Sequence, residues 1–92
     1  MIYINAVTTV RLTGSVTGAT VTCRVLDEAA ELANISLTGD GHGNYSGVIG
    51  TAATGALVPN REYGIEVTVV SGGSVIDYSK ELHNAIVRGF SE

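Results

Sequence analysis

Apolar and polar residues alternate along most of this 92-residue chain, and such alternation is typical of β-strands with one buried face. The clearest run covers residues 62–69, in which Tyr63, Ile65, Val67 and Val69 would face inwards. Valine and threonine dominate the regular stretches, and helical signals are nearly absent. The pattern therefore predicts an all-β protein.

Further runs of the same kind lie on both sides of this segment. Alternation places the following apolar residues together on one face of each run: Ile2, Ile4, Ala6, Val10 and Leu12; then Val21, Cys23 and Val25; then Ile35 and Leu37, which would face inwards; then Tyr45 and Ile49; and finally Ile76, Tyr78 and Leu82. The register stays open over residues 83–90.

Turn residues separate the runs at residues 13–18, 27–31, 51–56 and 71–74. The stretch "TAATGA" at residues 51–56 is expected to be a small-residue loop, and "SGGS" at residues 71–74 is expected to close a hairpin. About six or seven antiparallel strands with turns every 8–12 residues predict a β-sandwich. The chain has the length of one domain, residues 1–92.

The composition excludes several classes of protein. With 45% hydrophobic residues, the chain is not expected to be disordered. No apolar run approaches the ~20 residues of a membrane span, and the first residues lack the features of a signal peptide. We therefore expect no contact with a membrane.

The charge distribution argues against nucleic acid as a partner. The formal net charge is −4, Lys80 is the only lysine, and the arginines are scattered too widely to form a basic patch. Cys23 is the only cysteine, so an internal disulfide cannot form, which favours folding in a reducing cytoplasm. Because Cys23 alternates with valines, we expect an inert thiol in the core.

The stretch "LTGDGHGNYSG", residues 37–47, raises the question of a ligand site. A calcium loop needs several carboxylates and a glycine in sixth position, but counting from Asp40 gives one carboxylate and Tyr45 sixth. A phosphate loop would need a Gly-Lys-Ser/Thr ending, which is missing. A zinc site would require His42 and Asp40 to meet His83 or Cys23.

A hairpin turn explains the same residues without a ligand. Gly39, Gly41 and Gly43 would supply positive φ angles. The side chains of Asp40 and Asn44 would accept hydrogen bonds from backbone amides. His42 then lies at the tip of the loop. We expect no metal and no cofactor here.

The stretch "ALVPNREYGIEVTV", residues 56–69, carries the most specific motif, formed by Leu57, Pro59, Tyr63, Ile65 and Val67. It resembles the corner between strands E and F of fibronectin type III and related immunoglobulin-like domains. The resemblance implies that the hydroxyl of Tyr63 meets the backbone upstream. The alternative is that Tyr63 is only an inward aromatic residue.

The hairpin "GDGHGNYSGVI" before this corner is also similar to bacterial and viral immunoglobulin-like modules, over roughly residues 20–70. The chain has no tryptophan and no second cysteine to pair with Cys23, so it departs from antibody-type and strict fibronectin domains. The resemblance thus implies an immunoglobulin-like β-sandwich.

The short length, the initial methionine and a lysine-poor composition rich in Gly, Val, Thr and Ala resemble small accessory virion proteins of tailed phages. This resemblance implies a structural protein that decorates a capsid or tail, with a capsid or other virion protein as partner. Such a protein is made in the host cytoplasm and located in the virion, and it can form a small homo-oligomer.

No catalytic arrangement is evident, because nothing places a serine beside His42 or His83 and an aspartate, and G-x-S-x-G is absent. We therefore expect that this protein is not an enzyme. The alternative to a virion protein is a binding module of a bacterial surface or adhesin-type protein. In either case, the segments Ile2–Leu12 and Ser74–Val87 are the expected sheet edges, nearly without protective lysines.

Overall fold

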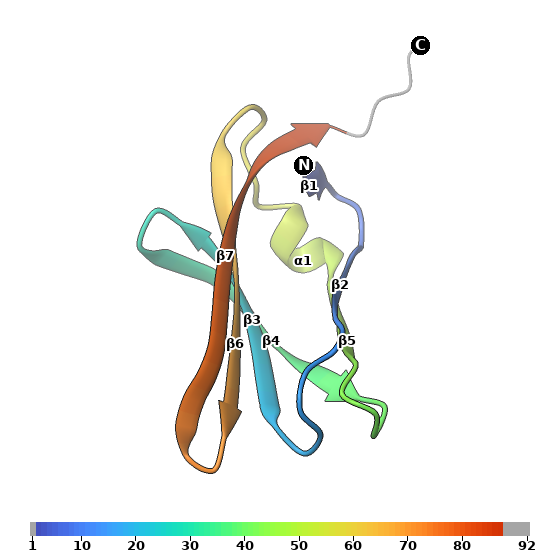
Figure 1. Ribbon diagram of the computed structural model, residues 1–92. Coiled ribbons are helices and arrows are strands. Elements are labelled where there is room, and N and C mark those ends of the chain that lie inside the picture. Colours follow the sequence, from blue (N-terminus) through green and yellow to red (C-terminus); the bar gives the residue numbers. More distant parts are fainter. Residues whose placement is uncertain (1, 88–92) are drawn as a thin grey trace.

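Within residues 2–87, which the computed structural model describes, the chain forms seven strands and one short helix (Figure 1). The elements are β1 (Ile2–Ile4), β2 (Thr8–Leu12), β3 (Thr20–Asp27), β4 (Ala30–Gly39), β5 (Tyr45–Ile49), α1 (Thr51–Thr54), β6 (Glu62–Ser71) and β7 (Ser74–Val87). The expected all-β class is confirmed.

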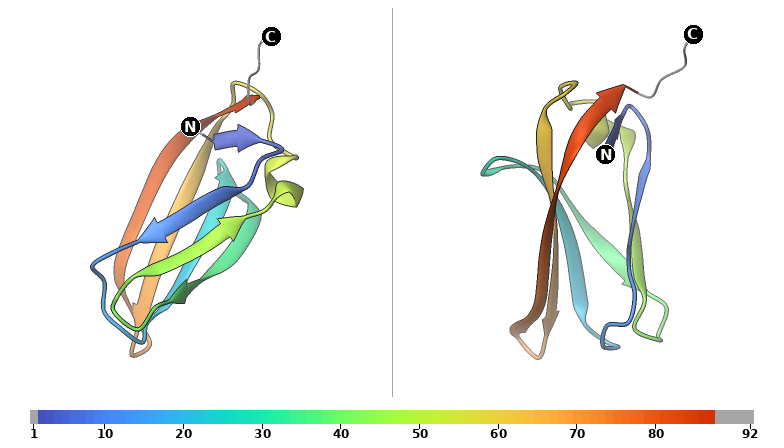
Figure 2. Two further views of the ribbon diagram at one scale, coloured as in Figure 1. Left: turned by 90° about the vertical axis from the view of Figure 1, so that its right-hand side faces the viewer. Right: turned by 45° about the horizontal axis from the view of Figure 1, so that its top comes forward.

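The strands belong to one hydrogen-bonded sheet in the order β1-β7-β6-β3-β4-β5-β2. The two outermost strands, β1 and β2, follow each other in the chain, so the sheet curls into a nearly closed, barrel-like shape (Figure 2). The prediction of antiparallel strands alone is wrong in one place, because β1 runs parallel to the end of β7. Sequence alternation defines a strand but not its partner.

The first apolar run is two strands rather than one. Asn5 has a φ angle of 61°, which turns the chain out of β1 and leads it across to β5, where Thr8 pairs with Ile49. The hydroxyl of Thr54 donates a hydrogen bond of 2.8 Å to the carbonyl oxygen of Ala6 and holds this crossing in place.

The segment expected as a small-residue loop contains helix α1 instead. The amides of Ala53 and Thr54 donate to the carbonyl oxygen of Gly50, and the amide of Gly55 donates to that of Thr51. Alanine has the highest helix propensity, and the fully buried Thr54 anchors the turn to the crossing between β1 and β2. Tertiary contact therefore decides the conformation of this segment.

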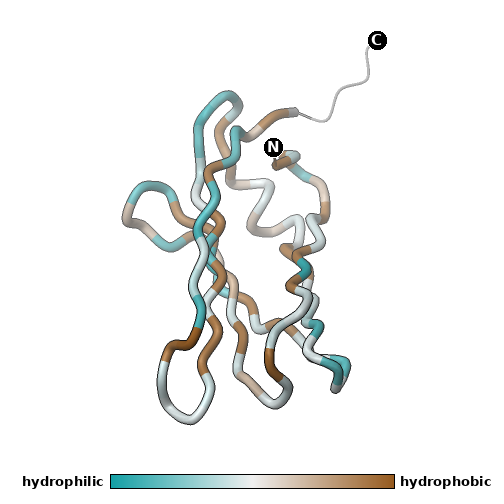
Figure 3. Tube along the Cα trace, in the orientation of Figure 1, coloured by the Kyte–Doolittle hydropathy of each residue, from teal (hydrophilic) through white to brown (hydrophobic). Residues whose placement is uncertain are grey.

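The core contains residues from β3, β4, β6 and β7 as well as from β1 and β5. Figure 3 shows hydrophobic positions, in brown, along strands on both sides of the curled sheet. The inward positions predicted in β3 and β5 are buried. In β6, Tyr63 and Val69 are buried, whereas Ile65 and Val67 are only partly buried. The buried cluster comprises Ile2, Val21, Cys23, Val25, Leu37, Tyr45, Ile49, Leu57, Tyr63, Val69 and Ala85.

The apolar residues that alternation groups on one face of β7, Ile76, Tyr78 and Leu82, are 48%, 53% and 60% exposed, so this face is not part of the core. Pairing of Tyr78 with Thr68 and of Leu82 with Gly64 places these two side chains on the outer face. The register shifts between Val69 and Val70 of β6, and such a shift moves side chains to the other face.

The register of the last run, left open from the sequence, is defined as far as Val87. His83 pairs with Tyr63 of β6, and Ile2 of β1 pairs with Ala85. Residues 88–90 lie outside the described residues.

Candidate functional site

The glycine-rich segment is a hairpin loop, residues 40–44, between β4 and β5. Oδ1 of Asp40 accepts hydrogen bonds from the amides of His42 and Asn44, at 2.7 and 3.3 Å, and Oδ2 accepts one from Nδ2 of Asn44 at 2.9 Å. The Asn44 side chain, followed by the His42 amide, lowers the pKa of Asp40. Both carboxylate oxygens of Asp40 therefore already accept hydrogen bonds within the turn.

The glycines of this segment have different roles. Gly41 and Gly43 have φ angles of 85° and 86°, as predicted. The prediction of a positive φ angle for Gly39 is wrong, because Gly39 ends β4 in extended backbone and pairs with Tyr45. A Cβ at Gly39 would lie 2.8 Å from the ring of Tyr45, so that site needs a glycine for space.

The residues considered for zinc do not converge. His42 is exposed in the loop, Cys23 is buried in the core, and His83 lies on β7 with Nε2 3.1 Å from Glu81. Within residues 2–87, no group of three or more His, Cys, Asp or Glu side chains is arranged to hold a metal ion.

The corner before β6 has the geometry that the motif implies. The hydroxyl oxygen of Tyr63 accepts a hydrogen bond of 2.8 Å from the amide of Val58, five residues upstream. Tyr63 and Leu57 are buried, and Pro59 lies in the exposed turn between them. Further along β6, Ile65 and Val67 are partly buried against the core.

A second tyrosine makes a similar contact that the sequence analysis missed. The hydroxyl of Tyr45 donates to the carbonyl oxygen of Val16 at 2.7 Å and accepts from the amide of Ala19 at 3.0 Å. It thereby fixes the turn between β2 and β3. The only signal for this contact in the sequence was an inward tyrosine, which does not identify a partner about 30 residues earlier.

Cys23 is 1% exposed, and its neighbours on the inner face of β3 are Val21 and Val25. Burial raises the pKa of its thiol from 9.0 to about 11, and the negative charge of Glu66 adds to this effect. A thiol of this kind is a poor nucleophile, because the thiolate is the reactive form.

Cys23 should therefore react with a thiol reagent only as fast as the protein unfolds. Since its pKa is raised in the folded state, its contribution to stability is complete below pH 9 and is lost as the pH rises towards about 11. Denaturant unfolding of the wild type and Cys23→Ala across this range should give a difference that shrinks with rising pH. Immediate stoichiometric labelling of the native protein would contradict the assignment.

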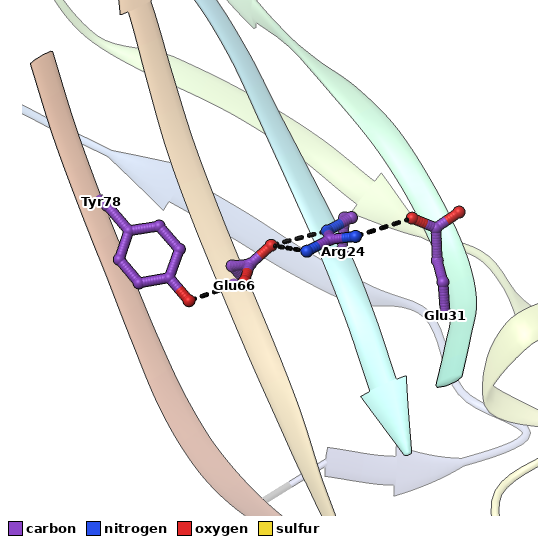
Figure 4. A network of polar contacts seen from close by, with 4 residues as sticks. All are labelled: Arg24, Glu31, Glu66 and Tyr78. Carbon is purple, nitrogen blue, oxygen red and sulfur yellow. Dashed lines mark hydrogen bonds and ion pairs between the residues drawn. The ribbon is translucent and has the colours of Figure 1, made fainter. Parts of the chain in front are cut away.

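A row of four polar side chains crosses the outer face of β7, β6, β3 and β4 (Figure 4). Glu66 lies at its centre and is only 7% exposed. Its Oε1 accepts from Nε of Arg24 at 2.6 Å, and its Oε2 accepts from the hydroxyl of Tyr78 at 2.6 Å. Nη1 of Arg24 lies 3.4 Å from Oε1 of Glu31.

The sequence assigned Glu66 to the outer face but did not indicate its burial. The hydrogen bond from Arg24, followed by that from Tyr78, lowers the pKa of Glu66. A paired carboxylate of this kind ties neighbouring strands together through cross-strand contacts. The contacts of Glu66 with Arg24 and Tyr78 thus join β3, β6 and β7.

Replacing Glu66 by Gln should make the free energy of unfolding fall less steeply as the pH is lowered. The pKa of Glu66 is lowered on folding, so its contribution is present above the usual glutamate range and disappears as the pH falls through the folded-state value. Urea unfolding between neutral pH and pH 3 should show a smaller loss in Glu66→Gln than in the wild type. Glu62→Gln, which removes a carboxylate from an exposed site on the same strand, is the control for the change of net charge.

The sheet leaves long strand edges open, as predicted for the first and last runs. β7 pairs with β6 from Ser74 to Asn84, whereas β1 covers its other side only from Ala85 onwards. Among the described residues, β2 pairs with β5 alone. Between these two edges is a groove of about 350 Å³, with Ile65 and Val67 among its lining residues.

Comparison with known proteins adds no relative. No protein-family model matches the chain, and no curated protein or solved structure matches it significantly. Among residues 2–87, no helix is long and apolar enough to cross a membrane.

Proposed function

We propose that this chain is a non-enzymatic structural protein that binds a repeating protein lattice, as an accessory or decoration protein of a tailed-phage virion. The observation that carries the proposal is the pair of open edges on β2 and β7. An open edge offers unpaired amides and carbonyls to a strand or loop of another protein.

The open edge of β7 has little protection against such pairing. Lys80 is the only lysine of the chain, and lysine is a common guard of exposed edges. A Cβ at Gly64 of β6 would lie 2.7 Å from Cε of Lys80, so the lysine side chain leans over β6 and away from the edge. The edge is thus left accessible to a partner.

The proposal extends to the fold, which we infer to be an immunoglobulin-like sandwich. Its support is that β4 and β5 share only two residue pairs, which divides the sheet into a β7-β6-β3-β4 group and a β5-β2 group. Both groups contribute to one core. The contact of Tyr63 with Val58 also suits the corner of fibronectin-like domains.

Small size does not prevent stable attachment to a lattice. A subunit that touches several neighbours is retained even if each contact is weak, because bound copies hold their remaining contacts at high effective concentration. The net charge of −4 favours a lattice face that is neutral or basic.

The test is to delete the gene in the source phage and compare mutant with wild-type particles. We expect mutant particles to lack this protein and to lose infectivity faster on heating or at low salt, with recovery when purified protein is added back. Wild-type particles that never contained the protein would refute the proposal. Its recovery in a bacterial envelope fraction would support the alternative, a binding module of a surface protein.

A further inference from the structure

β7 carries an unusual share of the exposed apolar side chains. Of the large hydrophobic residues that are exposed in the described part of the chain, four belong to this strand: Val75, Ile76, Tyr78 and Leu82. Within residues 2–87, no strand pairs with the outer edge of β7 between Ser74 and Leu82. A long, apolar open edge favours pairing with another chain over remaining free in water.

The regular part of this edge is limited on both sides. The irregularity opposite Val69 and Val70 leaves Ile76 without a partner in β6, so regular pairing begins at Asp77. At the other end, β1 occupies the edge from Ala85. The part of the edge that remains for regular pairing is therefore centred on residues 78–82.

A second copy of β7 can pair with this segment in few registers. In an antiparallel pair, opposite residues lie on the same face of the sheet. The two-fold axis of a symmetric pair therefore lies midway between the two copies of one residue, and that residue identifies the register. An axis at Ser79 would place Asp77 opposite Glu81 of the second copy, and an axis at Glu81 would place two Glu81 side chains opposite each other. Both registers oppose carboxylates, which is unfavourable.

An axis at Lys80 gives complementary pairs instead. On the outer face, Tyr78 lies opposite Leu82 of the second copy, which joins two exposed apolar side chains. On the other face, Ser79 lies opposite Glu81 of the second copy. Each pair occurs twice because of the symmetry.

The two Lys80 residues also lie opposite each other in this register, but their charges are directed away from the edge. The side chain of Lys80 leans over Gly64, and its charge acts on Glu66 of β6. The repulsion between the two ammonium groups is therefore small.

We infer that two copies of this chain join antiparallel along residues 78–82 of β7, with the two-fold axis at Lys80. The β7-β6-β3-β4 groups of the two copies then form one extended sheet. The inference concerns the isolated protein and does not depend on attachment to a lattice.

Disulfide cross-linking tests the register. In Lys80→Cys, the two Cβ atoms would be about 5 Å apart, close to the span of a disulfide, whereas in Ser79→Cys and Glu81→Cys they would be about 7–8 Å apart. Mild oxidation should cross-link Lys80→Cys much faster than either control, with the buried Cys23 unreactive in all three. Equal rates at the three positions, or no cross-link at position 80, would overturn the register.

Sedimentation equilibrium tests the dimer itself. The wild type should show a concentration-dependent dimer, and Leu82→Asp should raise the dissociation constant at least about tenfold, because two apolar pairs are lost at once. Val48→Asp is the matched control, since Val48 is 50% exposed on β5, and it should leave the constant unchanged. A wild type that stays monomeric at every concentration, or an equal effect of both variants, would overturn the inference.

Discussion

Gly43→Ala is expected to destabilise the protein by about 3 kcal/mol or more, because two costs add at this site. Gly43 has a φ angle of 86°, which an alanine adopts only with strain. A Cβ would also collide with the carbonyl oxygen of Ser15, whose amide donates a hydrogen bond to the carbonyl oxygen of Gly43. The loop and the turn before β3 would have to separate.

Gly41→Ala separates the two costs. Gly41 has nearly the same φ angle, 85°, but no atom lies within 4 Å of a Cβ placed there. Its loss of stability should be about 1–2 kcal/mol, from backbone strain alone. Denaturant unfolding of both variants gives the comparison, and equal losses would show that the glycine loop does not pack against the turn at Ser15.

Tyr45→Phe is expected to cost about 2–3 kcal/mol, more than the about 1–2 kcal/mol expected for Tyr63→Phe. The hydroxyl of Tyr45 has two backbone partners, Val16 and Ala19, and both lose a hydrogen bond in the variant. The hydroxyl of Tyr63 has one such partner, Val58. Both substitutions keep the ring and so preserve most of the packing.

Chemical denaturation of the two variants against the wild type measures this difference. If Tyr63→Phe unfolds at the wild-type midpoint, the corner does not depend on its hydroxyl and the fibronectin-like interpretation loses its main support. If Tyr45→Phe costs no more than Tyr63→Phe, water replaces the tyrosine at the turn between β2 and β3.

The sequence predicted those features that depend on neighbouring residues. Alternation identified the inward positions of β3 and β5, and "SGGS" identified the hairpin between β6 and β7, where Gly72 and Gly73 have positive φ angles. The turn function of Asp40 was likewise apparent, because its partners lie within four residues.

Features that depend on distant partners were missed or predicted wrongly. The hydrogen bond from Thr54 to Ala6 joins two segments that show no sign of contact in the sequence. The burial of Glu66 depends on Arg24 and Tyr78 from the two neighbouring strands. The outward direction of Leu82 follows from a register that alternation within β7 could not define.

The candidate interaction surface was predictable only in outline. The low lysine content and the location of two strands at the beginning and end of the sequence indicated open edges. The sequence did not show that Lys80 leans over Gly64, or that β1 leaves the edge open up to Asn84, because both depend on how the strands lie side by side.

The most direct test of the central proposal, that this chain binds a repeating lattice, is to count its copies by quantitative mass spectrometry in purified particles of the phage proposed as its source. We predict many copies per particle, in a fixed ratio to the major capsid or tail protein that does not change between preparations. Particles without the protein, or with traces that vary from one preparation to the next, would contradict the claim.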